Sequence, residues 1–131
     1  MNPVSSEIRR LALRIRRFPA TTERRLPVYC SSGRPRRANQ HGLQEIPLEA
    51  ITGTLEPTRA AQFDGAFRPV KKSARRRWER IWLAEDHGAV LPPISVVPVG
   101  ENTFAVVDGH HRVSVAHARG AVAIDATVES R

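Results

Sequence analysis

Cysteine, aromatic residues and long apolar runs are all scarce in this sequence of 131 residues. The single cysteine, Cys30, cannot form an internal disulfide or a CxxC pair for metal or redox chemistry. No apolar segment approaches the roughly 20 residues of a membrane-spanning helix, and the N-terminus lacks the apolar stretch of a secretory signal. We therefore expect a cytoplasmic protein without a membrane span, and the sequence leaves its oligomeric state open.

Length and composition limit the protein to one small domain and an extension. Of its residues, 40% are hydrophobic and only 5% are aromatic, so the core must consist mainly of Val, Ile, Leu and Ala. Such side chains suit a small sheet packed on short helices. We expect an α/β or α+β fold.

Excess positive charge is absent from two thirds of the chain. Residues 1–42 contain ten arginines and two acidic residues, whereas residues 43–131 contain eleven basic and eleven acidic residues. The net charge of +8 therefore lies entirely within residues 1–42. This distribution predicts a basic extension over 1–42 and an electrically neutral domain over 43–131, in which residues 71–77 form the one dense basic run.

The extension divides into a helical and a linker segment. Apolar residues recur at three- and four-residue steps from Ile8 to Phe18 with arginines on the other face, which predicts a basic amphipathic helix ended by Pro19. Residues 20–42 are rich in Thr, Ser, Arg, Gly and Pro, which is typical of a mobile linker. The helix either docks on its own domain or binds an anionic partner such as nucleic acid or a membrane surface.

The domain is expected to begin with a strand over 46–51 and a long loop over 53–69, which is a candidate ligand flap. A helix over 73–87 follows, with Trp78 and Trp82 on its buried face and Gly88 as its stop. Its Arg76 and Arg80 are spaced to share an anion. A hairpin of strands 94–99 and 103–107, a helix over 110–119 and a strand over 122–128 complete the domain, with Pro98 at a bulge or an edge.

Five consecutive residues between the second hairpin strand and the next helix point to anion binding. They are Asp108, Gly109, His110, His111 and Arg112. The first N–H groups of a helix are unpaired and lie at the positive end of its dipole. Gly109 admits a ligand close to the backbone, Asp108 can cap the helix, and the Arg112 guanidinium suits a phosphate. The alternative is a well-capped, solvated turn without a ligand.

A metal site built from Asp108, His110 and His117 is a further alternative. His110 and His117 lie two helical turns apart, roughly 10 Å along the axis, whereas zinc ligands must each approach the ion to about 2.1 Å. The spacing therefore argues against a metal.

The order of these elements, with Pro92-Pro93-Ile94 opening the hairpin and Gly109-His110-His111-Arg112 opening the helix, resembles the ParB/sulfiredoxin fold over residues 43–131. The resemblance implies a small α+β domain with a mixed sheet and short helices, preceded by a basic helical or disordered extension. Members bind nucleotide phosphates at this turn: ATP in sulfiredoxins, CTP in ParB and ADP in the free-serine kinases.

The resemblance extends to individual residues of the ligand site. His111 and Arg112 are similar to the phosphate-binding His and Arg of sulfiredoxins, Arg76 to their helix lysine, and Arg59 to the arginine of the ParB Pro-x-Arg loop. His110 stands where sulfiredoxins have their catalytic cysteine, so sulfiredoxin activity is not expected.

Together these features predict a domain that binds a nucleotide or another phosphate ligand, with or without hydrolysis or phosphoryl transfer. The expected ligands are ATP, ADP or CTP with Mg²⁺, held by Gly109, His110, His111, Arg112, Arg76 and Arg59. The catalytic candidates are Asp108, His110 and His111, with Asp64 and Glu56 as loop alternatives for a base. The alternative function is a nucleic-acid-binding protein or ParB-like nuclease that uses residues 1–42 to bind DNA.

Overall fold

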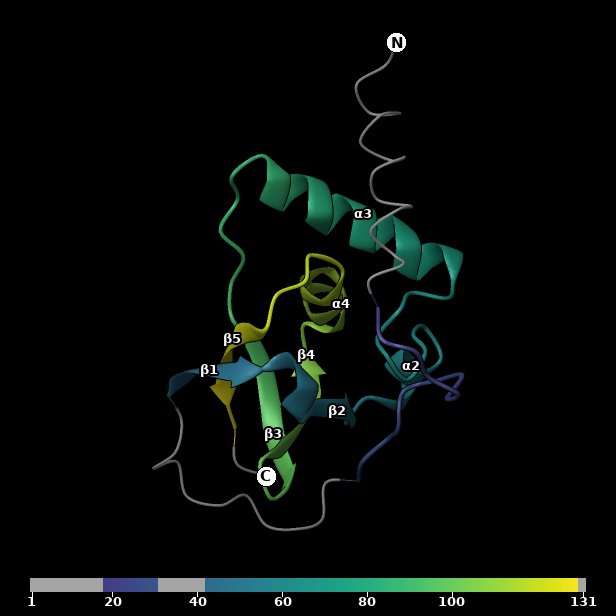
Figure 1. The fold of residues 1–131 in the computed structure, drawn as a ribbon, viewed down its shortest axis with the longest axis vertical. Coiled ribbons are helices and arrows are strands. Elements are labelled where there is room, and N and C mark those ends of the chain that lie inside the picture. Colours follow the sequence, from purple (N-terminus) through teal and green to yellow (C-terminus); the bar gives the residue numbers. More distant parts are fainter. Residues whose placement is uncertain (1–17, 31–41, 130–131) are drawn as a thin grey trace.

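The computed structural model describes residues 18–30 and 42–129, which form an α+β fold around one mixed sheet (Figure 1). The five strands lie in the order β1-β5-β3-β4-β2. They are β1 (Leu43–Pro47), β2 (Ile51–Thr54), β3 (Ile94–Gly100), β4 (Thr103–Asp108) and β5 (Ala123–Val128). β1 pairs with β5 and β3 with β4 in antiparallel fashion, whereas β2–β4 and β3–β5 are parallel. The expected α+β class with a mixed sheet is confirmed.

The second half of the chain follows the sequence pattern closely. The helices are α2 (Pro57–Ala60), α3 (Lys72–Asp86) and α4 (His110–Ala118), and Gly88, with φ 92°, follows the end of α3. Pro98 pairs with Phe104 of β4, a shift of register follows it, and the pairing of β3 with β5 ends at Val96, so Pro98 lies at a bulge in a part of β3 that β5 does not cover. Within the described residues, no helix is long and apolar enough to cross a membrane.

The single strand expected over 46–51 is wrong, because the chain there forms two strands at opposite edges of the sheet. Pro47, which lacks an N–H group for the ladder, ends β1. The short 3-10 helix η2 (Leu48–Ala50) follows, with Leu48 buried, and the chain enters β2 at Ile51. Because β2 pairs with β4, Thr54, the last residue of β2, lies next to β4 and the start of α4.

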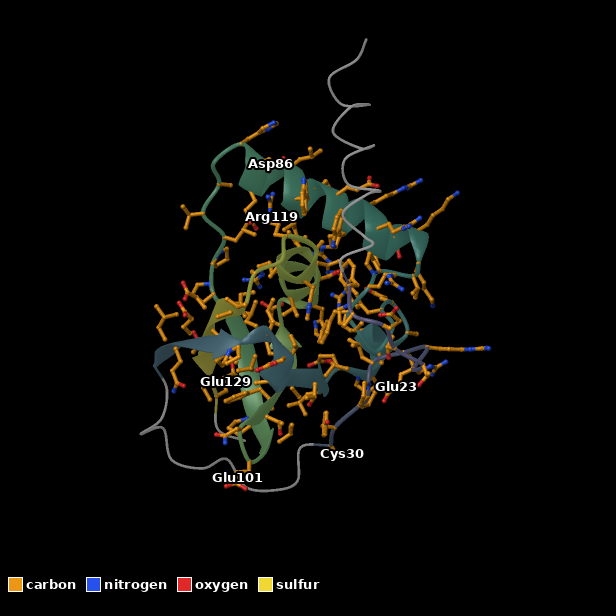
Figure 2. All side chains as sticks on the ribbon, in the orientation of Figure 1. Glu23, Cys30, Asp86, Glu101, Arg119 and Glu129 are labelled. Atoms are coloured by element: carbon orange, nitrogen blue, oxygen red, sulfur yellow. The ribbon has the colours of Figure 1, made fainter. Side chains whose placement is uncertain are left out.

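Helix α4 lies between the sheet and α3, so it is buried on both sides (Figure 1). Trp78 and Trp82 of α3 pack with Val115 and Ala118 of α4, as expected for the core face of the longer helix. At the end of α4, the Arg119 guanidinium stacks on the Trp82 ring at 3.9 Å and bonds Asp86 at 2.9 Å (Figure 2). Helix α4 is therefore held against α3 by contacts at several points along its length.

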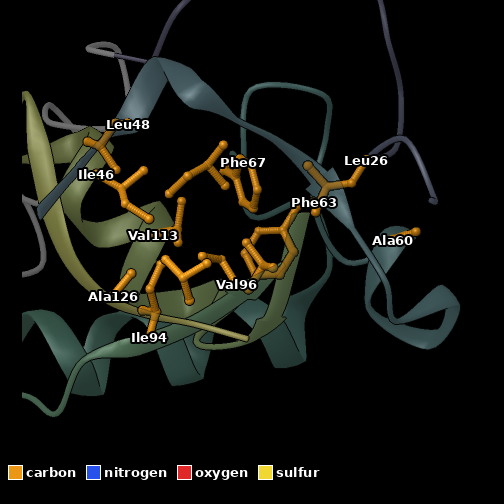
Figure 3. Close-up of a cluster of buried hydrophobic side chains, with 13 residues drawn as sticks. Leu26, Ile46, Leu48, Ala60, Phe63, Phe67, Ile94, Val96, Val113 and Ala126 are labelled. Carbon is orange, nitrogen blue, oxygen red and sulfur yellow. The ribbon is translucent and has the colours of Figure 1, made fainter. Parts of the chain in front are cut away.

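On its sheet side, α4 contributes Val113 to the main core. Figure 3 shows Val113 among the side chains of Ile46, Ile94 and Phe67. The core also contains Leu26, which comes from the segment before the sheet and is only 1% exposed. Because the side chains around the first turn of α4 are fixed from both sides, the position of that turn is set by packing.

Residues 18–30, which we call the strap, pack on the domain and do not form the mobile linker that their composition suggested. Phe18 joins the tryptophan cluster and Leu26 the main core. The N–H of Tyr29 donates to the carbonyl of Thr54 at 2.8 Å, and the N–H of Thr54 donates to the carbonyl of Pro27 at 2.9 Å. The strap therefore extends the sheet beyond β2. The helix expected over 5–18 and the linker over 31–41 lie outside the described residues, except for Phe18.

The loop over 53–69 is not a flap, because its two phenylalanines anchor it in the core. Phe63 and Phe67 are 0% and 1% exposed. Asp64 accepts hydrogen bonds from the N–H groups of Ala66 and Arg68, both at 2.9 Å. The Asp64 carboxylate therefore stabilises the turn, which explains why the polar, glycine-containing segment around it is ordered.

Candidate functional site

Strand β4 runs into α4 through Gly109, at the centre of the turn that the sequence indicates. Gly109 is the N-cap residue, with φ 108° and ψ 24°, and the helix begins at His110. The predicted capping role of Asp108 is wrong, because the cap falls one residue later and no side chain bonds the end of the helix. The N–H groups of the first turn therefore remain without an acceptor from the helix, at the positive end of its dipole.

Packing requires glycine at this junction. An L-residue rarely adopts φ 108°, and a Cβ at position 109 would lie 2.8 Å from the Cβ of Ile94 in β3. The backbone of Gly109 therefore rests directly on β3. This close approach fixes where the first turn of α4 lies relative to the sheet.

His110 is buried beneath the turn and bonded to the edge of the sheet. Its Nε2 lies 2.6 Å from the Oγ1 of Thr54, which is fully buried in β2. The same Oγ1 accepts the N–H of Glu56 at 2.8 Å and lies 3.3 Å from the carbonyl oxygen of Val106 in β4. One hydroxyl thus joins β2, β4 and the start of α4, a contact that the sequence did not reveal.

Replacing Thr54 by valine is expected to lower the free energy of unfolding by about 1–3 kcal/mol, because the buried His110 ring and the Glu56 N–H each lose a hydrogen-bond partner. Urea denaturation measures the change. Thr54→Ser keeps the hydroxyl and serves as the control. Because valine keeps the methyl group and serine lacks it, a loss in Thr54→Ser with none in Thr54→Val would show that the methyl group, and not the hydrogen bonds, matters.

Both histidines of the turn are neutral at physiological pH. Burial lowers the pKa of His110 from 6.5 to about 4, and the positive charges of Arg59 and His111 add to this effect, which Asp108 partly opposes. Burial also lowers the pKa of His111 from 6.5 to about 4, followed by the charges of Arg77 and Arg59. The histidines can therefore donate hydrogen bonds to an anion, but the positive charge at the turn comes from arginine.

The guanidinium of Arg112 is held by the loop before β3. Its Nη1 donates to the carbonyls of Pro92 and Pro93 at 2.6 and 3.0 Å, and its Nη2 donates to the Asp108 carboxylate at 3.1 Å. The side chain is 15% exposed. Three of the five guanidinium N–H groups are thus used inside the protein. Arg112 has a structural role in addition to any contact with a ligand.

A pocket of about 120 Å³ lies at the N-terminus of α4. Its lining residues are Arg59, Arg77, Ile81, Asp108, Gly109, His110, His111 and Arg112. Arg59 comes from α2, Arg77 from α3 and Arg112 from α4, so three helices bring guanidinium groups to one point. Within the described part of the chain, neither Arg59 nor Arg77 forms an ion pair with a carboxylate. The pocket is therefore cationic, and among the described residues two of its cations, Arg59 and Arg77, have no carboxylate partner, although Arg59 donates to Gln62 at 3.4 Å.

A second pocket of about 320 Å³ lies on the other side of Arg112 and has mixed charge. It is bounded by Pro92 and Pro93 and carries Glu45, Glu85 and Asp125. These carboxylates oppose an anion there, so the smaller pocket is the better anion site despite its size.

The small pocket brings together most, but not all, of the residues that the sequence nominated. Arg59 and the Asp108–Arg112 turn line it, but Arg76 does not, because Arg77 takes that position. Successive residues of an α-helix are rotated by about 100°, so a shift of one residue changes the face. The spacing of Arg77 and Ile81, four residues apart beside the buried Trp78, is the signal that could have identified Arg77. Glu56 and Asp64 do not line the pocket.

His117, considered with Asp108 and His110 as a ligand of a metal, lies elsewhere. Its ring packs against Phe18 and Phe67, with centroids 6.1 and 5.9 Å apart, and burial lowers its pKa. Across residues 18–30 and 42–129, no group of three or more His, Cys, Asp or Glu side chains is arranged to hold a metal ion.

Comparisons with known proteins inform only the fold. No protein-family model and no curated protein matches the sequence. Among solved structures, this chain is similar to the sulfiredoxin of Arabidopsis thaliana, with a TM-score of 0.46 and 20% sequence identity over 69% of this chain and 86% of that one. The likeness is one of fold. It carries no inference about ligand or activity.

Proposed function

We propose that the pocket at the N-terminus of α4 binds the phosphate of a nucleotide or of another small phosphate ligand. The observation that carries the proposal is that Arg59, Arg77 and Arg112, from three helices, line one pocket at the first turn of α4, which has no side-chain cap. Guanidinium groups and a helix N-terminus are both complementary to phosphate. Within the described residues Arg59 and Arg77 line one pocket without carboxylate partners, and their mutual repulsion costs free energy that an anion between them would offset.

The volume of the pocket limits what it holds. Ligand pockets for whole small molecules are commonly about 300–1,000 Å³, whereas this one is about 120 Å³. It fits a phosphate group, and the remainder of an ATP, ADP or CTP molecule would extend outside it.

Mg²⁺ commonly binds through one or two carboxylates together with the phosphates of its ligand. Asp108 is the one carboxylate among the lining residues, and its side chain is 79% exposed. We propose that Asp108 contacts a phosphate-bound Mg²⁺, which would supply further charge neutralisation. Asp108 and the two neutral histidines are then the groups available for proton transfer if the bound phosphate reacts.

The Arg77→Gln variant is expected to bind phosphate ligands at least about tenfold more weakly, because a charge-assisted hydrogen bond contributes about 1.5–3 kcal/mol. The measurement is calorimetric titration of the full chain with ATP, ADP, CTP and pyrophosphate, with and without Mg²⁺. Arg75→Gln is the matched control, since it removes the same charge from the exposed surface of the same helix.

Arg112 is a poorer probe, because Arg112→Ala would also release the carbonyls of Pro92 and Pro93. Absence of heat with all four compounds would refute the proposal. The same binding by Arg77→Gln and Arg75→Gln would place any site elsewhere.

A further inference from the structure

Outside the pocket, the strongest unexplained feature is the basic outer face of α3. Between residues 71 and 80 the chain has six cations and one acidic residue, Glu79. The six are Lys71, Lys72, Arg75, Arg76, Arg77 and Arg80, and all are exposed. Figure 2 shows nitrogen-tipped side chains projecting outward from this helix. We call Lys72, Arg76 and Arg80, which share one face at four-residue spacing, the α3 ridge.

The ridge is unfavourable for the helix that carries it. Like charges four residues apart repel, and the first turn of α3 contains no acidic residue, so cations lie at the positive end of the helix dipole. Within the described residues, no ion pair joins the ridge to a carboxylate. Neither folding nor packing accounts for this concentration of charge, because the core face of α3 is formed by Ala74 and the two tryptophans.

We propose that the α3 ridge binds the phosphate backbone of a nucleic acid. At 1.5 Å per residue, Lys72 and Arg80 lie roughly 12 Å apart along the helix, a span that covers about three to four phosphates of one strand. Two of the three ridge residues are arginines, whose planar groups suit phosphate oxygens. This surface is separate from the phosphate pocket, because the pocket is lined by Arg77 and by none of the ridge residues.

A nucleic acid fits this surface better than a membrane does. Membrane-bound amphipathic helices insert an apolar face beside their cations. The large apolar side chains of α3 already pack inward, since Trp78 and Trp82 are 1% and 4% exposed, and Ile81 and Leu83 are partly buried against the same cluster. The ridge therefore presents positive charge but no apolar surface that could insert into a membrane.

The test is fluorescence anisotropy of the full chain with labelled 20-nucleotide single-stranded and duplex DNA between 50 and 200 mM salt. Arg76→Gln/Arg80→Gln is expected to weaken binding roughly tenfold at 100 mM salt and to reduce the slope of log K against log salt by about 1.5, since each lost phosphate contact removes about 0.7–0.9. Arg24→Gln/Arg25→Gln removes the same charge from the exposed strap and should change both values much less.

Equal losses in the two double variants, or no loss in either, would overturn the proposal. So would binding to phosphatidylserine vesicles that depends on the ridge while DNA binding does not. Arg76→Lys/Arg80→Lys keeps the charge and should keep the salt slope, which separates loss of charge from loss of folding. The pocket can fail its own test independently, because that test depends on Arg77.

Discussion

Replacing Gly109 by alanine is expected to lower the free energy of unfolding by roughly 2–5 kcal/mol. A left-handed backbone conformation costs an L-residue about 1–2 kcal/mol, and forcing an extra methyl into a packed site costs about 1–3 kcal/mol. Both costs apply here, because φ is 108° and the new Cβ would collide with Ile94. Urea or thermal denaturation of the full chain measures the loss.

Gly88→Ala is the matched control for this variant. Gly88 also has a positive φ, 92°, but a Cβ there would have no atom within 4 Å. The Gly88→Ala variant should therefore lose only the stability that the left-handed backbone conformation costs, about 1–2 kcal/mol. If both variants lose the same stability, the contact between the turn and β3 is not what requires glycine at position 109.

Acidification from pH 6.5 to pH 4 is expected to destabilise the protein steeply. His110 and His111 each bind a proton near pH 6.5 in the unfolded chain but only near pH 4 in the folded protein. Between these values the two residues bind up to two more protons in the unfolded state, so they lower the free energy of unfolding by up to about 2.7 kcal/mol per pH unit. His117, whose pKa burial also lowers, adds to the fall. Above pH 6.5 this contribution is fully present.

Urea denaturation at a series of pH values measures the slope. His111→Gln removes one of the buried groups and should reduce the slope by about a third to a half. A slope that is insensitive to His111 would mean that burial of this ring does not govern acid stability.

Local patterns were sufficient for the second half of the fold. The helix with Trp78 and Trp82, the hairpin, and the helix between Gly109 and Gly120 all follow from periodicity and from glycine stops, which depend on neighbours in the sequence. The first half depends on distant contacts. Leu26 and Phe63 lie in short stretches whose apolar residues follow no helical or strand period, and only the core that surrounds them reveals why their segments are ordered.

The candidate site shows the same division. The turn from Asp108 to Arg112 could be recognised because its groups are consecutive. The convergence of Arg59 and Arg77 on it depends on how α2 and α3 pack against α4, and the Thr54 hydroxyl reaches His110 only because β1 and β2 occupy opposite edges of the sheet. Sequence spacing alone placed the α3 contact one residue away, on Arg76.

An anion is expected to bind at the first turn of α4, and NMR titration of the isotopically labelled full chain with pyrophosphate detects this binding residue by residue. We expect saturable shifts of the backbone N–H signals of His110, His111 and Arg112 and of the Arg77 side chain, with the signals of His117 unaffected. If the turn shows no saturable shift, the phosphate pocket is wrong, and shifts confined to the exposed face of α3 would assign the binding of phosphate to the ridge alone.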